Sequence, residues 1–242
     1  MTSDAQDPTP HDLLDQVADA TARLLETVSG LRDGDVIEPS LLPGWTRGHV
    51  LAHLARNADS LVNLLIWART GIETPQYASS FVREFDIDAG SPRPVAEQLR
   101  DIEAAANRWS ALASTASREN WSATVRTRAG RAIPAAEIAW MRLLEVEIHH
   151  VDLAASYTPA DWPASFVARA LPRVTADLAK VLDPDTPPFD VRAADLDFAA
   201  SLAPGDPAHT VLGPAPSLLA WLIGRSPGRD LSGPLPDLPA WR

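Results

Sequence analysis

The sequence predicts a mostly α-helical protein, with a four-helix bundle over residues 1–157 and a small α+β domain over residues 158–242. Three observations support this prediction. Four segments of the first part carry apolar residues at helical spacing, and four such faces bury one another in a bundle. The proline content then rises, because 14 of the 22 prolines lie from Pro159 onward. Short apolar segments between the later prolines are typical of strands.

The helices of the first part are expected at residues 12–29, 46–70, 95–114 and 134–156. Thr46 is a suitable N-cap for the second helix, because its hydroxyl can accept from a free backbone N–H of the first turn. Pro134 suits the first turn of the fourth helix, where no backbone N–H is needed. These four segments are expected to form the bundle.

Two connections separate these helices. The segment 74–94 holds three residues that break helices, Gly90, Pro92 and Pro94. It is therefore expected to be a long irregular connection, of the kind that can lie over a site. Residues 120–133 alternate in character and contain a turn at Gly130, which predicts a short hairpin or a plain loop.

The second part combines helical and extended segments. Helices are expected at residues 166–182 and 216–223. Short strands are expected between them, at residues 189–192, 196–202 and 209–212. This mixture predicts a small α+β domain.

Composition limits the classes of function. The chain has no cysteine, so any thiol chemistry must use a thiol from outside the protein. A net charge of −11 opposes binding to nucleic acid or to anionic membranes. The N-terminal residues are too polar for a signal peptide, and no apolar run reaches the roughly 18 residues of a membrane helix. We therefore expect a cytoplasmic monomer that binds small molecules.

Four of the six histidines lie on two of the predicted helices. On the second helix, a helical wheel places five polar residues on one stripe: His49, His53, Arg56, Asn57 and Ser60. On the fourth helix, Glu145 and His149 are four residues apart, so their side chains project over one patch of surface. Together with His53 they would supply two imidazoles and one carboxylate, a ligand set of catalytic zinc.

The spacing leaves other interpretations open. Glu147 and His150 form a Glu-x-x-His pair like that of di-metal bundles, and His49 could replace His53. Glu147 also lies closer than Glu145 to the apolar stripe of the same helix. Glu–His pairs at helical spacing are common as plain hydrogen-bonded pairs, so periodicity alone does not choose among these arrangements.

Four stretches of the chain carry a resemblance to a known family: LLPGWTRGHVLAHLARNA (41–58), NLLIWARTGIETPQY (63–77), WMRLLEVEIHHVDL (140–153) and LLAWLIGR (218–225). They are similar to the mycothiol-dependent maleylpyruvate isomerases of the DinB-like metal-binding superfamily. The resemblance implies a DinB-like four-helix bundle whose zinc ligands carry over to His53, Glu145 and His149. Glu147 and His150 depart from the family pattern, and both could lie behind the ligands.

The resemblance also implies an activity. The family uses mycothiol, the low-molecular-weight thiol of actinobacteria, to convert maleylpyruvate to fumarylpyruvate in gentisate breakdown. The thiolate would add to the cis double bond, the resulting enolate would allow rotation, and expulsion of the thiolate would give the trans isomer. The same metal and thiol would also serve a mycothiol S-transferase acting on another electrophile. A different class of function is also open, that of a metal-binding bundle without catalytic activity.

The substrate of such an isomerase carries two carboxylates, which arginine binds through paired hydrogen bonds. Arg225, in the C-terminal Gly-Arg that resembles the family's second-domain arginine, is the first candidate for substrate binding and catalysis. Arg83, in the long connection, is the second. Arg56 and Asn57 follow His53 by one turn and are candidates for supporting the ligands, with Asn57 also a candidate for contacting the substrate.

Overall fold

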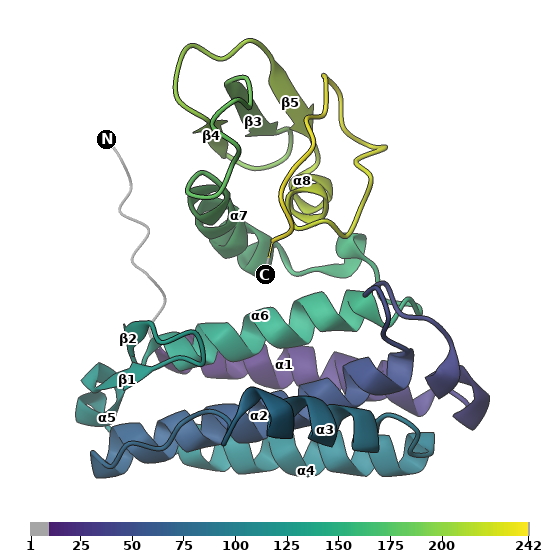
Figure 1. The fold of residues 1–242 in the computed structure, drawn as a ribbon, viewed down its shortest axis with the longest axis vertical. Helices are drawn as coiled ribbons and strands as arrows, with labels where there is room; N and C mark the ends of the chain where they lie inside the picture. Colours follow the sequence, from purple (N-terminus) through teal and green to yellow (C-terminus); the bar gives the residue numbers. More distant parts are fainter. Residues whose placement is uncertain (1–9, 242) are drawn as a thin grey trace. The chain divides into compact units, whose positions relative to one another are not determined.

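The computed structural model describes residues 10–241, and the chain divides into two compact units, Met1–Ser156 and Tyr157–Arg242 (Figure 1). Residues 1–9, on which the expectation of no signal peptide rests, lie outside the described residues. The first unit is helical, and the second combines helices with a small sheet. The predicted fold class, mostly α with a small C-terminal α+β domain, is confirmed.

Four long helices form the bundle of the first unit: α1 (Pro10–Ser29), α2 (Arg47–Thr70), α4 (Val95–Ser114) and α6 (Glu137–Asp152). α2 packs along α4 and α6, and α1 packs along the same two helices from the other side (Figure 1). The interior is filled by fully buried aliphatic residues, among them Leu24, Leu54 and Ile102. Burial of such side chains stabilises the bundle by about 1.5–3 kcal/mol each.

The start of α2 is fixed by the features that the sequence predicts. Thr46 is the N-cap, and its hydroxyl accepts from the backbone N–H of His49. Gly48 lies against the backbone carbonyl of Ser91, where a Cβ atom would collide. The backbone at Ser91 therefore crosses the first turn of α2 at close range.

Two expectations for the connections are wrong. The segment 74–94 contains the helix α3 (Ser80–Gly90), capped by the Ser79 hydroxyl. Most apolar side chains of α3 are exposed, with Phe81 75% accessible, so no buried stripe marks this helix in the sequence. Gly90, Pro92 and Pro94 lie at or after the end of this helix, so they do not prevent it from forming. Pro134 does not begin the fourth helix, because it lies in a strand and α6 starts three residues later.

The hairpin between α4 and α6 is confirmed. After the short helix α5 (Arg118–Ser122), β1 (Thr124–Arg126) pairs antiparallel with β2 (Ala132–Pro134). Gly130 takes the left-handed conformation of the turn, with φ of +81°. Pro134 is paired opposite Thr124 at the end of the ladder, where a missing N–H is tolerated.

The second unit contains a three-stranded sheet and two helices. Its elements are α7 (Ala164–Leu178), β3 (Phe189–Ala193), β4 (Ala199–Leu202), β5 (Thr210–Gly213) and α8 (Ala215–Leu222). The strand order is β4-β3-β5, with β3 antiparallel to β4 and parallel to β5. Two 3-10 turns, Asp33–Ile37 and Pro159–Asp161, complete the described elements. Among the described helices, none has the length and apolar character that crossing a bilayer requires.

Candidate metal centre

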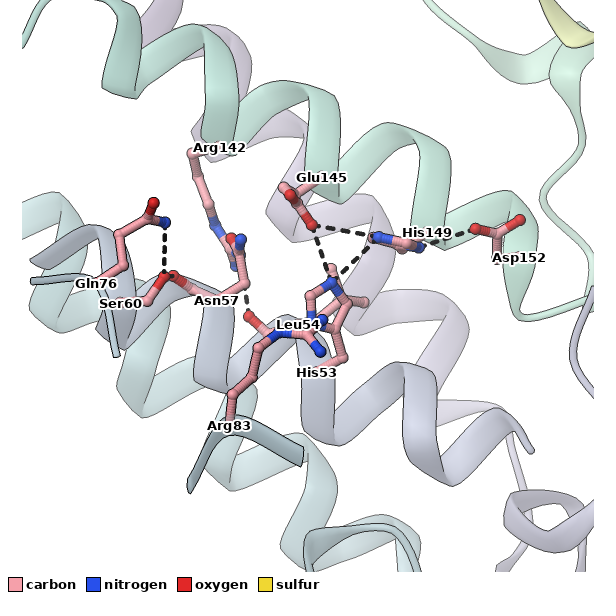
Figure 2. A network of polar contacts seen from close by, with 10 residues as sticks. All are labelled: His53, Leu54, Asn57, Ser60, Gln76, Arg83, Arg142, Glu145, His149 and Asp152. Carbon is pink, nitrogen blue, oxygen red and sulfur yellow. Dashed lines mark hydrogen bonds and ion pairs between the residues drawn. The ribbon is translucent and has the colours of Figure 1, made fainter. Parts of the chain in front are cut away.

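Three side chains from α2 and α6 converge on one point (Figure 2). Nε2 of His53 lies 3.0 Å from Oε2 of Glu145 and 3.2 Å from Nε2 of His149. Nε2 of His149 lies 3.2 Å from the same carboxylate oxygen. These three donor atoms form a triangle that could hold a metal ion, the combination expected from the sequence.

The backbone explains how the three side chains meet. Glu145 and His149 are one turn apart on α6, so both point toward α2. His53 lies on the buried face of α2, with 5% of its surface exposed. The side chain of Glu145 keeps 31% of its surface exposed, so the cluster lies at the edge of the bundle and is reached from solvent.

The surroundings shift the pKa of each of the three side chains. Burial lowers the pKa of His53 to about 4, although its hydrogen bond with Glu145 acts in the opposite direction. Burial would also lower the pKa of His149, but hydrogen bonds with Asp152 and Glu145 raise it to about 9. Burial favours the neutral form of Glu145, yet hydrogen bonds from both imidazoles hold its pKa well below the usual value. The cluster therefore offers an anionic carboxylate and a neutral imidazole near pH 7.

Asp152 is a member of the site that sequence reasoning missed. Its Oδ2 lies 2.8 Å from Nδ1 of His149, and its side chain is fully buried. The spacing of three residues on a helix is the signal that could have found it. Because Nδ1 of His149 faces Asp152, Nε2 is the ring nitrogen that faces His53 and Glu145.

Arg83 reaches the same cluster from α3, a helix where an irregular connection was expected (Figure 2). Its Nη2 lies 3.4 Å from Nδ1 of His53. Its guanidinium also lies over the ring of Tyr77, 5.8 Å from the ring centre. A positive charge therefore stands beside the three donor atoms, although α3 itself is largely exposed.

Asn57 follows His53 on α2, but its amide is directed into the bundle. It is buried, and its Oδ1 accepts a hydrogen bond of 2.9 Å from Nη1 of Arg142. Arg142 in turn lies on α6, three residues before Glu145. Asn57 thus joins the two helices that supply the donor triangle.

The polar stripe predicted on α2 divides into two sides. His53, Asn57 and Ser60 are buried, whereas His49 pairs with Thr46 and with the exposed Asp88. Arg56 binds Asp59 and Asp101, with Nη2 2.6 Å from Oδ1 of Asp101. His49 and Arg56 therefore do not join the triangle. The ring of Trp45 packs edge to face against His53, with ring centres 5.5 Å apart.

The alternative pair on α6 faces a different helix. Glu147 forms an ion pair of 2.7 Å with Arg23 of α1, and Nε2 of His150 lies 2.8 Å from the hydroxyl of Thr27. These contacts place both side chains toward α1 and away from the donor triangle. The alternative of a metal held by Glu147 and His150 with a histidine of α2 is therefore not supported by the geometry, and neither residue lies behind the ligands.

Arg225 lies in the second unit, directly after α8. Its backbone N–H donates to the carbonyl of Ala220 at 2.7 Å, and its Nη1 donates to the carbonyl of Ile223 at 2.8 Å. Both contacts are with backbone carbonyls of the second unit. Its part in substrate binding stays a prediction.

Comparison with known proteins agrees with the two-unit organisation. Residues 17–154 match the mycothiol maleylpyruvate isomerase N-terminal domain, and residues 161–240 match the MDMPI C-terminal domain. The crystal structure of the mycothiol-dependent maleylpyruvate isomerase is similar with a TM-score of 0.89 and 30% identity, covering 100% of both chains. A histidine-to-alanine mutant of that protein gives the same values. Curated proteins give no significant match. The chain belongs to the mycothiol-dependent maleylpyruvate isomerase family.

Proposed function

We propose that the protein is a zinc-dependent and mycothiol-dependent isomerase that converts maleylpyruvate to fumarylpyruvate. The observation that carries this proposal is the triangle of His53, Glu145 and His149 in a chain that belongs to this family. A relative 30% identical over its whole length bears the name of that activity. The lack of cysteine agrees with a thiol supplied by a small molecule in the cytoplasm.

The donor triangle fits zinc in both composition and size. Ligand atoms on a tetrahedral zinc, with bonds of about 2.0–2.1 Å, lie about 3.3 Å apart. The three separations here are 3.0, 3.2 and 3.2 Å. Three protein ligands would leave one coordination position for a substrate, which is the arrangement of catalytic zinc sites. The bond between His149 and Asp152 is the kind that orients a metal-binding imidazole.

The tautomer needed for metal binding has a consequence for Arg83. An imidazole that binds through Nε2 carries its remaining proton on Nδ1. Nδ1 of His53 faces Nη2 of Arg83, which is also a donor. Two donors do not form a hydrogen bond, so with His53 as a ligand the guanidinium of Arg83 is left to bind another acceptor. A carboxylate of the substrate is the acceptor that we propose.

The charge of the site favours anionic substrates. Glu145 and Asp152 are balanced by Arg83 and by the guanidinium of Arg142, so a divalent cation leaves the centre positive. A zinc ion bound there would supply the charge that keeps a nearby thiol deprotonated. Arg83 is our candidate for binding a substrate carboxylate, and Arg225 remains the candidate that the family resemblance implies.

The proposed reaction consists of addition of the thiol, rotation about a single bond and elimination of the thiol. The cis double bond of maleylpyruvate accepts the sulfur of the thiol, and its electron pair moves to the conjugated keto group as an enolate. The adduct rotates about the new single bond. Return of the electron pair re-forms the double bond in the trans form and breaks the carbon–sulfur bond. Arginine contacts to the carboxylates would hold the adduct and stabilise its enolate charge.

Product analysis tests this function. The zinc-loaded protein is incubated with mycothiol and maleylpyruvate, and the products are followed by mass spectrometry and proton NMR. We expect fumarylpyruvate of unchanged mass, formed only when thiol and metal are both present. A stable thiol adduct would instead indicate a mycothiol S-transferase. Absence of bound metal after reconstitution would contradict the metal centre itself.

A further inference from the structure

Arg142 is a fully buried cation that the proposed reaction does not contact. Its side chain extends from α6 across the bundle toward α2 (Figure 2). Nη1 donates to the carbonyl of Leu54 and to Oδ1 of Asn57, each at 2.9 Å. Nε and Nη2, although buried, have no hydrogen-bond partner among the described residues. One side of the guanidinium is thus satisfied and the other is not.

The unsatisfied side is the one that recognises carboxylates. In a planar guanidinium, the N–H bonds of Nε and Nη2 are parallel, and together they bind the two oxygens of a carboxylate. Leaving such donors buried without acceptors costs about 1–3 kcal/mol or more. An acceptor at this edge would recover that free energy.

Arg142 lines a cavity of about 210 Å³ between α1 and α4. Its walls are mainly apolar and include Leu14, Val17 and Leu25. Trp109 also lines it, and Nε1 of Trp109 is a second buried donor without a partner among the described residues. No acidic side chain is found among the described residues that line this cavity. In a chain with a net charge of −11, a cationic cavity without carboxylates is unusual.

We propose that this cavity is a second ligand site, which binds a small carboxylic acid with an apolar body. The carboxylate pairs with Nε and Nη2 of Arg142 and accepts from Nε1 of Trp109, and the apolar body packs between α1 and α4. The volume exceeds that of one water molecule, about 30 Å³, several-fold. Burial lowers the pKa of Arg142 to about 10, so the guanidinium remains charged at neutral pH.

The site is separate from the metal centre. The residues lining the cavity include none of His53, Glu145 and His149. Arg142 lies three residues before Glu145 on α6, but the cavity that Arg142 lines is formed by residues of α1 and α4, whereas Glu145 points toward α2. A ligand in the cavity therefore occupies different space from the proposed substrate, and its binding can be measured independently of turnover.

The test uses benzoate as the carboxylate and benzyl alcohol as its neutral counterpart. Each is titrated into the full-length protein while the indole N–H signals are followed by nitrogen-edited NMR, with Trp109 assigned from Trp109→Phe. Ala22→Leu fills the cavity from the exposed side of α1 without altering Arg142. Ala104→Leu places the same side chain at an exposed position of α4 that does not line the cavity.

We expect benzoate to shift the Trp109 signal with saturation. Benzyl alcohol should bind at least about tenfold more weakly, because a charge-assisted pair contributes roughly 1.5–3 kcal/mol. Ala22→Leu should weaken benzoate binding by a similar factor, and Ala104→Leu should leave it unchanged. The proposal is wrong if benzoate gives no saturable shift, if benzyl alcohol binds equally well, or if Ala22→Leu binds benzoate like the unaltered protein.

Discussion

The carboxylate of Asp152 lies 2.8 Å from Nδ1 of His149 and is completely buried. Asp152 is the last residue of α6, and His149 lies three positions before it in the last turn. This contact determines which nitrogen of His149 faces His53 and Glu145. A side chain that touches no proposed substrate thus sets the orientation of a proposed metal ligand.

Replacement of Asp152 tests this role. Asp152→Asn keeps the size of the side chain but removes the charge that favours an Nδ1 proton on His149. We expect zinc affinity to fall about tenfold to a hundredfold, measured by competition with a chromophoric chelator. Asp88→Asn is the matched control, because Asp88 is an exposed partner of His49. Equal zinc affinity in Asp152→Asn and the unaltered protein would refute the role.

Arg83 is expected to act on the substrate and not on the metal. Arg83→Gln should lower kcat/KM for maleylpyruvate about tenfold to a hundredfold, the loss of a charge-assisted pair, with unchanged zinc content. Steady-state kinetics and metal analysis measure the two effects. Arg69→Gln alters an exposed arginine of α2 as a control. Unchanged kinetics in Arg83→Gln would remove Arg83 from the site.

Arg225 is the candidate from the second unit. Arg225→Ala should weaken turnover and leave the zinc content unchanged, because the proposed metal ligands lie in the first unit. Kinetics with maleylpyruvate and metal analysis measure the two effects, and circular dichroism checks that the variant is folded. Arg229→Ala changes an exposed arginine of the same unit for comparison. Kinetics equal to those of the unaltered protein would refute the assignment.

Glu147 is expected to contribute to stability. Its carboxylate is buried at 1% exposure and pairs with Arg23, so Glu147→Gln should lower the free energy of unfolding by about 1–3 kcal/mol. Urea denaturation measures this change, and metal analysis should give the same zinc content as before. Glu145→Gln, in contrast, should lower the zinc content. Loss of zinc in Glu147→Gln would favour the alternative metal site.

Much of the fold follows from local sequence patterns. The sequence predicts α1, α2 and α4 close to their observed limits, because apolar residues recur at helical spacing in each of them. α3 was missed, since Phe81 and Phe85 are exposed and only Ile87 and Gly90 of that helix are buried. Pro134 was misplaced because the same residue suits a helix start and the end of an edge strand.

For the candidate site, too, the sequence predicts what lies within one helix better than how two helices meet. Glu145 and His149 could be paired from their spacing, because both belong to one helix. Choosing His53 over His49 required the family resemblance, since the two are one turn apart and the choice depends on how α2 is rotated against α6. The unsatisfied edge of Arg142 arises from tertiary packing alone, and no spacing in the sequence predicts it.

The account depends most on His53 as a ligand of a metal that the thiol-dependent reaction requires. The decisive measurement is zinc content and mycothiol-dependent isomerisation of maleylpyruvate in His53→Ala, with His49→Ala prepared in parallel. We predict that His53→Ala loses both properties and that His49→Ala keeps both, because His49 pairs with Thr46 outside the triangle. Full zinc content and full activity in His53→Ala would contradict the account.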